Sequence, residues 1–497
     1  MKKIFCQISM VSFLLALGLL WSCTSSFAYN ISEDIMINGY IENYSAVRLF
    51  DHSQNELEDG DLAQMRTTIF LDGQWNFSEN FKFKAIGRAV YDGAYDINDH
   101  DYSHGYDPAD EDYWPGPDEL GMREYFDPRE YYVNYHTRDF SLTAGRQQVV
   151  WGEADNLRMA DMVNPLDLSW DWSFPAWEDI RVPLHLVRAR YNVPHSKHHL
   201  EFEVVWNPYD FRPQQTAPFG ANWQPLGMAT NPIQYEVFRD QVEEDLPDRS
   251  MSDTGEIGGR IKAHFGPLAT SWFAFYHRND QTAGLPIFTF NPQDALDPAN
   301  LPFEFKWPYK TTLGGTFNYY QAALKTVFRG EFSYDIDQPF GYLIDFTPNS
   351  DFLSGEYEEK DKFSFMLGFD RNTWIRFLND YKTFYFSGQW FQSFVLDADE
   401  GELTTGYGDE GDDTSQTVFS LLVNTEYMFG KIKPEVVAVH SLTEECGFVD
   451  YSVEYQPTFT WSFTLGARNI WGNNDNVGIW GPVRENDQIY IKVKKTF

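Results

Sequence analysis

The connections between the predicted strands alternate between long and short along nearly the whole chain. From Ile35 to Phe497 the sequence reads as about eighteen short segments in which apolar and polar residues alternate. Such a period of two is typical of strands with one apolar and one polar face. A closed barrel in an outer membrane gives this rhythm, because its turns are short on the periplasmic side and its loops long on the outer side. The pattern predicts an all-β, transmembrane, antiparallel up-and-down barrel.

The predicted strands pair in sequence order across the outer loops. The eighteen ranges are 35–48, 63–77, 81–95, 124–136, 140–151, 184–193, 199–206, 255–265, 269–279, 311–321, 324–334, 361–373, 382–395, 415–428, 433–441, 447–456, 459–469 and 486–497. Brief connections such as 78–80 and 137–139 separate the pairs and are assigned to the periplasmic side. Sixteen strands are the alternative, if one weak pair is a hairpin within a loop.

The beginning of the chain resembles a secretory signal. A basic start and an apolar stretch precede Ser26-Phe27-Ala28, which offers small residues at a cleavage site. We expect residues 1–28 to be a cleaved signal peptide and residues 29–497 to form one barrel domain in the outer membrane of a Gram-negative bacterium. A transmembrane helix and a lipoprotein signal at Cys23 are the alternatives.

The last predicted strand ends on an aromatic residue, Phe497. Ile489, Ile491 and Val493 share its face of that strand. An apolar, alternating last strand that ends in Phe resembles the signal read by the barrel assembly machinery of the outer membrane. We therefore expect that machinery, outer-membrane lipid and lipopolysaccharide as partners. An ordinary edge strand is the alternative, and the sequence leaves the oligomeric state open.

The charge of the chain is strongly negative and unevenly distributed. Two lysines are the only charged residues before Tyr29, so the remainder carries 38 − 2 = 36 basic and 74 acidic residues, a net charge of −38. This acidity argues against nucleic acid as a partner. Acidic residues cluster without any Lys or Arg at 96–119 and 397–413, in predicted outer loops. Solvated loops are the favoured interpretation, and binding of divalent cations to clustered carboxylates is the alternative. No other cofactor or metal is predicted.

Basic residues fall on the polar faces of the predicted strands. We assign to the pore lining Arg66, Lys82, Lys84, Arg88, Arg188, Arg190, Arg260, Lys262, Lys325, Arg329 and Arg468. The same faces also carry acidic residues that would pair with some of these bases: Glu201, Glu203, Glu331, Glu426 and Glu454. Rings of Arg and Lys favour the passage of anions, whereas an internal network of salt bridges that only holds the walls is the alternative. We expect such a lumen to be wet rather than packed with apolar side chains.

The segment 145–183 is the most distinctive local sequence, and the loop within it, 152–183, is unusually long. Loops of this length are uncommon without a role. Large aromatic side chains are costly to leave in water, and this loop contains four: Trp170, Trp172, Phe174 and Trp177. We hypothesise that the loop folds inward and constricts the pore. A surface cap that packs on neighbouring loops is the alternative.

The run GRQ…WGE, followed by NPLDLS and PLHLVRARY, resembles a proteobacterial outer-membrane family of unknown function. The resemblance covers residues 142–191, and the remainder agrees in layout. More distantly, the architecture is similar to that of alginate-export porins. The resemblance implies a barrel, an outer-membrane location and a role in transport, with an exporter of hydrophobic substrates as a partner. It supplies neither a substrate nor a catalytic residue.

These observations favour a porin-like channel for small anionic or amphipathic solutes. The alternative is a barrel that serves as a sheath or export duct for a partner complex, such as an exporter or a separate electron carrier. Cys446 is the only cysteine after residue 28, so neither an internal disulfide nor a C-x-x-C-H haem site is possible. No G-x-S-x-G or H-E-x-x-H motif is present. We expect no enzymatic activity.

Overall fold

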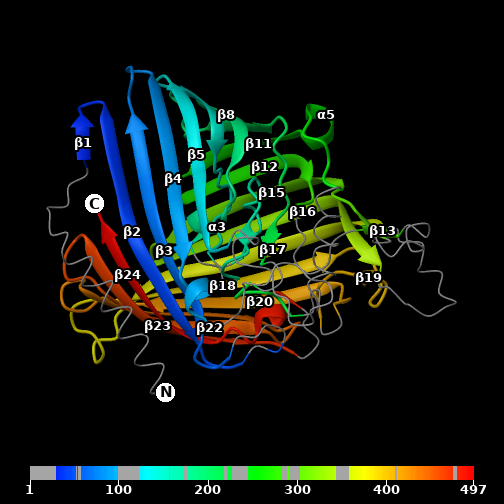
Figure 1. The fold of residues 1–497 in the computed structure, drawn as a ribbon. Helices are drawn as coiled ribbons and strands as arrows, with labels where there is room; N and C mark the ends of the chain where they lie inside the picture. The colour runs from blue at the N-terminus through cyan, green and yellow to red at the C-terminus, as the bar shows by residue number, and fades with distance from the viewer. Residues whose placement is uncertain are drawn as a thin grey trace.

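The structure, a computed structural model, describes most of the chain after residue 28. The described residues are 29–51, 53, 58–98, 122–155, 157–172, 176–217, 221–226, 245–280, 288–290, 303–342, 357–408, 411–473 and 478–497. Within them, eighteen antiparallel strands form a closed barrel, drawn in Figure 1. The expected fold class and the strand number of eighteen are thus correct.

Every barrel strand pairs with its neighbours along the chain. The strands are β2 (Ile35–Arg48), β3 (Leu62–Trp75), β4 (Phe81–Asp92), β5 (Glu124–His136), β6 (Phe140–Gln147), β8 (Leu184–Asn192), β9 (Glu201–Asn207), β11 (Glu256–Phe265), β12 (Leu268–Arg278), β15 (Tyr309–Gln321), β16 (Thr326–Tyr342), β17 (Tyr357–Thr373), β18 (Phe384–Val395), β20 (Ser415–Asn424), β21 (Ile432–Ser441), β22 (Gly447–Tyr455), β23 (Trp461–Trp471) and β24 (Gln488–Thr496).

The barrel closes where the last strand pairs with the first long one. The register of β2 and β24 runs from Tyr40 opposite Thr496 to Arg48 opposite Gln488. The final residue, Phe497, extends this pairing, since its backbone N–H donates to the carbonyl oxygen of Gly39 at 2.9 Å. Closure removes the free edges that an open sheet would expose.

Smaller elements lie outside the main ladder of strands. β1 (Tyr29–Ser32) pairs with β2, and β19 (Leu403–Thr404) pairs with the end of β16. The remaining elements are β7 (Asp167–Leu168), β10 (Gln215–Thr216), β13 (Phe288–Phe290), β14 (Phe303–Phe305), α2 (Ala94–Ile97), α3 (Trp177–Ile180), α5 (Met251–Thr254) and η3 (Gly481–Val483). No helix in the described part of the chain has the length and apolar character needed to cross a membrane.

The two faces of the strands differ in chemistry as the alternation predicts. On β23, Phe463 and Leu465 are exposed on the outside, while Thr464 and Arg468 are buried on the inside. The same parity applies to β4, where Tyr91 is exposed and its neighbours along the strand are buried. The barrel therefore has an apolar outer surface and a largely polar inner wall.

Two ends of the barrel can be distinguished by their connections. Connections such as 76–80, 137–139 and 266–267 join strands at the short-turn end, whereas 93–123, 148–183 and 208–255 join them at the long-loop end. Three neighbouring strands, β6, β8 and β9, are shorter than the strands on either side of them, β5 and β11.

The predicted strand 140–151 is too long, because β6 ends at Gln147. Val149 and Trp151 continue the apolar alternation, but they leave the sheet and pack inside the barrel with Leu184 and Leu186. Residues 148–151 keep the apolar alternation because they still have one buried and one exposed side, although they no longer pair with a strand.

Candidate functional site

The described residues of the connection from β6 to β8, which are 148–155, 157–172 and 176–183, lie inside the barrel. Arg88 of β4 donates to the carbonyl oxygen of Asp179 at 3.0 Å, and Arg329 of β16 donates to that of Glu153 at 2.8 Å. Since β4 and β16 lie nearly opposite each other in the closed strand order, a segment that touches both must cross the interior. We call these described residues the first interior segment; its helix α3 appears within the ring of strands in Figure 1.

The two ends of the first interior segment are held together by Asn164. Its side-chain oxygen accepts from the backbone N–H of Val149 at 2.7 Å, and its amide donates to the carbonyl oxygen of Val182 at 2.9 Å. A second amide contact reaches the carbonyl oxygen of Gln147 at 3.3 Å. Asn164 is almost fully buried, so one side chain fixes the place where the segment leaves and re-enters the wall.

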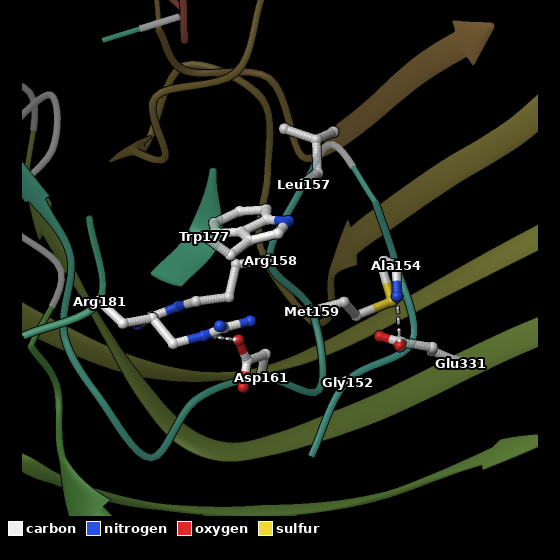
Figure 2. Close-up of a pocket in the computed structure, with 9 residues that line it drawn as sticks. All are labelled: Gly152, Ala154, Leu157, Arg158, Met159, Asp161, Trp177, Arg181 and Glu331. Atoms are coloured by element: carbon white, nitrogen blue, oxygen red, sulfur yellow. Dashed lines mark hydrogen bonds and ion pairs between the residues drawn. The ribbon is translucent and has the colours of Figure 1, made fainter. Parts of the chain in front are cut away.

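Glu331 of β16 anchors the middle of the first interior segment. Its buried carboxylate accepts backbone N–H groups from Glu153, from Ala154 at 2.8 Å and from Ala160 at 3.1 Å. Gly152 is required beside it, since a Cβ there would lie 2.9 Å from the Cβ of Asp161. Figure 2 shows this carboxylate under the turn of the segment. Three N–H donors satisfy a carboxylate that burial would otherwise destabilise.

Asp155 forms a second anchor on the neighbouring strands. Arg329 of β16 donates to its carboxylate at 3.1 Å, and Gln389 of β18 donates at 2.9 Å. The same guanidinium also pairs with Asp370 of β17 at 2.8 Å. Asp155 thus joins the segment directly to β16 and β18, and β17 is linked to it through Arg329.

Trp151 and Glu203 anchor the segment on the part of the wall formed by β8, β9 and β11. The indole N–H of Trp151 donates to the carboxylate of Glu203 at 2.7 Å. Arg188 of β8 and Arg260 of β11 pair with the same carboxylate at 2.8 and 3.2 Å. Because all of these groups are largely buried, each relies on the others for hydrogen bonds.

The later part of the segment packs against the far wall through Trp170, Asp171 and Trp172. Arg66 of β3 lies over the ring of Trp170, with 4.2 Å to its centroid. Arg468 of β23 pairs with Asp171 at 3.2 Å. Trp172 is buried in an apolar cluster with side chains of β17 to β23. We expected a wet lumen without apolar packing. That expectation is wrong beside β17 to β23, where apolar residues of the segment pack against apolar residues of the wall.

A second connection also enters the barrel, and the sequence analysis did not predict it. We call its described residues, 208–217 and 221–226, the second interior segment. Its strand β10 pairs in parallel with β7 of the first interior segment. Trp223 is buried in the same apolar cluster as Trp172. The carbonyl oxygen of Asn222 accepts from Arg48 of β2 at 2.6 Å. The sequence did contain an indication of burial, since this connection includes the large aromatic residue Trp223. The acidic residues later in the same connection instead favoured a solvated outer loop.

Most of the predicted pore-lining residues lie on the inner face with an acidic or interior-segment partner. Arg66, Arg88, Arg188, Arg260, Arg329 and Arg468 contact the interior segments or carboxylates beside them, as described above. Nearer the short-turn end, Lys84 donates to Asp72 at 2.6 Å and Lys262 pairs with Glu201 at 3.1 Å. Lys82 and Arg190 are half-buried on the same wall.

Lys325 does not lie on a strand. It ends the exposed turn between β15 and β16, where its φ of 52° and the contact of its N–H with the carbonyl oxygen of Ala322 at 3.3 Å define the turn. The predicted strand 324–334 begins two residues too early, because Leu324 resembles the first apolar residue of an alternating run. Lys325 is thus removed from the set of inner-wall residues.

The aromatic residues of the predicted constriction loop have different surroundings. Trp170 and Trp172 lie against the inner wall, as described above. Trp177 begins α3, and its indole N–H donates to the carbonyl oxygen of Asp155 at 2.7 Å. Phe174 lies outside the described residues. A small cavity remains between the segment and β16, lined in part by Trp177, Asp161 and Glu331 (Figure 2).

The described residues contain no group of three or more His, Cys, Asp or Glu side chains that could hold a metal ion. Of the acidic cluster at 96–119, residues 99–119 lie outside the described part, so cation binding there stays a prediction. Cys446 is free and buried beside β22, and burial raises the pKa of its thiol to about 11.

Residues 25–497 match the profile of a family described as a protein of unknown function, DUF1302. No curated protein matches the chain. Similar solved structures include OmpF of Salmonella typhi in complex with daunomycin, with 9% identity and a TM-score of 0.40 over 94% of this chain and 99% of that one. OpdK of Pseudomonas aeruginosa with vanillate has 8% identity and a TM-score of 0.46 over 94% and 99%. A BenF-like porin of Pseudomonas fluorescens Pf-5 has 8% identity and a TM-score of 0.45 over 94% and 98%.

Proposed function

We propose that this chain, which belongs to the DUF1302 family of unknown function, forms a channel in a bacterial outer membrane. In this proposal the first interior segment narrows the passage at the long-loop end. One observation carries the proposal: inward side chains from strands around the barrel hold the first interior segment where it crosses the interior. A barrel that served only as an outer scaffold would have no need of a crossing segment held in this way.

The apolar outer face supports the membrane location. Trp272, Ile257 and Leu465 are exposed on the outside of three different strands. Exposed large apolar residues on many strands would be costly in water and are expected where a barrel meets lipid. The same proposal includes three further points: residues 1–28 direct export of the chain, the last strand guides its assembly into the membrane, and the barrel contacts lipopolysaccharide.

The solutes we propose are small and anionic or amphipathic. At the short-turn end the inner wall carries partly exposed lysines, among them Lys262 and Lys494, each paired with only one carboxylate. Arg190 adds a further cation to this wall. Such a wall attracts anions weakly, because the paired acids reduce the field that the bases create.

The interior carboxylates support a channel rather than an enzyme. Glu203 and Glu331 are almost fully buried, and each accepts several hydrogen bonds or ion pairs from the wall and the segment. A general acid or base needs a free face toward a substrate, and these groups are already committed to holding the segment.

Planar-bilayer recordings of the purified full-length protein test the proposal. We expect small unitary conductance, because the crossing segment occupies the barrel, and a weak preference for anions in a salt gradient. The matched control is the same preparation after heat unfolding, which should give no channels. Absence of channels from folded protein, or strong cation selectivity, would contradict the proposal.

A further inference from the structure

The barrel wall has a notch above the short strands β6, β8 and β9. β5 pairs with β6 only from Tyr131 to His136, although β5 begins at Glu124. Among the described residues, 124–130 therefore has a strand partner, β4, on one side only. Both interior segments leave the wall at this place, one after β6 and the other after β9.

Polar side chains stand on the outer face below this notch. Leu142 and Val133 are exposed on the outside, and the alternation places Arg146 and Tyr131 on the same face. His185 lies opposite Arg146 in the register of β6 and β8. The outer face of β6 and β8 is otherwise lined by Phe140, Leu142, Ala144, Val187 and Ala189, so the polar residues interrupt an apolar surface there.

These residues form one connected group with the start of the second interior segment. The ring of His185 contacts the hydroxyl of Tyr131 and the carboxylate of Asp210, both at 2.7 Å. Arg212 pairs with Asp210 at 3.1 Å. We call Tyr131, Arg146, His185, Asp210 and Arg212 the notch cluster.

One contact passes through the wall. Asp127 lies on the inner face of β5, where Arg88 and Arg129 pair with it at 3.3 and 3.1 Å. Arg146 starts from the outer face of β6 and still approaches the same carboxylate at 3.6 Å. β6 does not extend beside residues 124–130 of β5. At this place, side chains rather than a strand separate the barrel interior from the outer surface.

The height of the notch cluster makes its charges unusual. Arg146 lies six residues above the first residue of β6, which at ~3.3 Å per residue and a tilt of about 40° is roughly 15 Å from the short-turn end. The apolar band of such barrels is about 25 Å tall. The cluster therefore stands within the upper part of the band, where ionisable groups are costly and mark functional sites.

The cluster and its wall contacts carry four guanidinium groups and four carboxylates, and the two signs are unevenly distributed among them. Arg88, Arg129, Arg146 and Arg212 share two contacting carboxylates, those of Asp127 and Asp210. Asp167 and Asp179 add negative charge near Arg88 on the inner side. Three of the four carboxylates, those of Asp127, Asp167 and Asp179, lie near Arg88. In the contacts described, Arg146 and Arg212 have between them the carboxylate of Asp210 and a share of that of Asp127.

We propose that the notch is a lateral binding site for a single-chain amphipath with an anionic head group, located in the outer leaflet of the membrane. Arg146 and Arg212 take the head group, and the exposed rings of Phe126, Tyr131 and Tyr209 flank its chain. This inference rests on the membrane location in the proposed function. It extends that function, because a solute bound at the notch enters or leaves the barrel through the wall, past the interior segments.

Binding of decyl phosphate to the full-length protein in a non-ionic amphipol tests this inference by isothermal titration. We expect saturable binding with one site per chain, weakened at least tenfold in the double variant Arg146→Ala/Arg212→Ala. The matched control is Arg138→Ala/Arg376→Ala, which removes two exposed arginines from turns at the short-turn end and should leave binding unchanged. The variant Arg146→Lys/Arg212→Lys keeps the charge and should bind between these limits.

Two further probes separate the sources of binding. Decyl maltoside has the chain without the charge, and inorganic phosphate has the charge without the chain; both should bind at least tenfold more weakly than decyl phosphate. Equal binding of inorganic phosphate, equal loss in both double variants, or no saturable binding by a protein whose gel mobility is heat-modifiable would overturn the inference. Bilayer conductance is read independently, so loss of this site and failure of the channel proposal are distinguishable.

Discussion

The two halves of the barrel interior hold their charges in different ways. At the long-loop end, Arg88 and Arg468 are 4% and 9% exposed and contact the first interior segment as well as wall carboxylates. At the short-turn end, the side chains of Lys262 and Lys494 are 37% and 33% exposed, and each pairs with one carboxylate of a neighbouring strand. Basic side chains of the inner wall are therefore packed against the first interior segment at the long-loop end, and they stay partly hydrated at the short-turn end.

This difference separates stability from permeation. Removing one partner of a buried ion pair costs about 3–5 kcal/mol, because a charge is left without compensation. An exposed pair contributes roughly 0–1 kcal/mol, because water screens it. Changes in the packed half should loosen the segment, whereas changes in the hydrated half should alter which ions pass.

The largest effect is expected from Glu331→Ala. The change leaves three backbone N–H groups of the first interior segment without their carboxylate, a loss on the order of 3 kcal/mol or more. We expect higher unitary conductance and a lower midpoint of guanidinium unfolding. The control is Glu454→Ala, which removes a half-buried carboxylate that pairs with Lys433 in the hydrated half. Equal conductance and equal midpoints in both variants would break the distinction between the halves.

Arg468→Ala should come next in size. Its loss leaves the carboxylates of Asp171 and Asp450 without their shared guanidinium, at a cost of about 3 kcal/mol in the free energy of unfolding. A double-mutant cycle with Asp171→Ala isolates the contact between wall and segment. We expect a coupling energy above about 1 kcal/mol; a value near zero would mean that the segment is held without this pair.

Lys262→Ala and Lys494→Ala should change stability little. We expect less than ~1 kcal/mol in the free energy of unfolding, because both pairs are partly exposed. The reversal potential in a salt gradient should nevertheless shift toward cation passage, since each change leaves Glu201 or Glu42 uncompensated. An unchanged reversal potential in both variants would place the ion path away from this wall.

The smallest effect concerns Cys446 at the edge of the apolar cluster. Burial raises the pKa of its thiol, so at pH 8 it is protonated in the folded protein and reacts slowly with a maleimide. Unfolding in guanidinium lowers the pKa again and should speed labelling at least tenfold. Rapid labelling of the folded protein would show that the cluster around Trp480 opens readily.

The fold was predictable from the sequence because each strand has its own local signal. Alternation on 81–95 or 447–456 depends only on which side faces lipid, and every predicted strand corresponds to an observed one. The error at 140–151 has a clear cause, since Val149 and Trp151 alternate like strand residues while packing inside. Local pattern does not distinguish a strand from a segment that is buried on one side for another reason.

The candidate site was predictable only in part. The length and aromatic residues of 152–183 pointed to an unusual connection, but its contacts depend on the barrel register. That Glu331 meets three N–H groups, or that Arg468 meets Asp171 far along the chain, follows from closure of the barrel and not from any local pattern. The inward course of 208–226 was missed for the same reason, as its pairing partner β7 lies in another connection.

The most direct measurement compares unitary conductance of the full-length protein with that of a variant lacking 153–181, both recorded in planar bilayers. Heat-modifiable gel mobility identifies the folded barrel in each preparation. If the first interior segment narrows the passage, deletion should raise the conductance several-fold while the weak anion preference of the lysine wall remains. An unchanged conductance in a folded deletion variant would contradict the account.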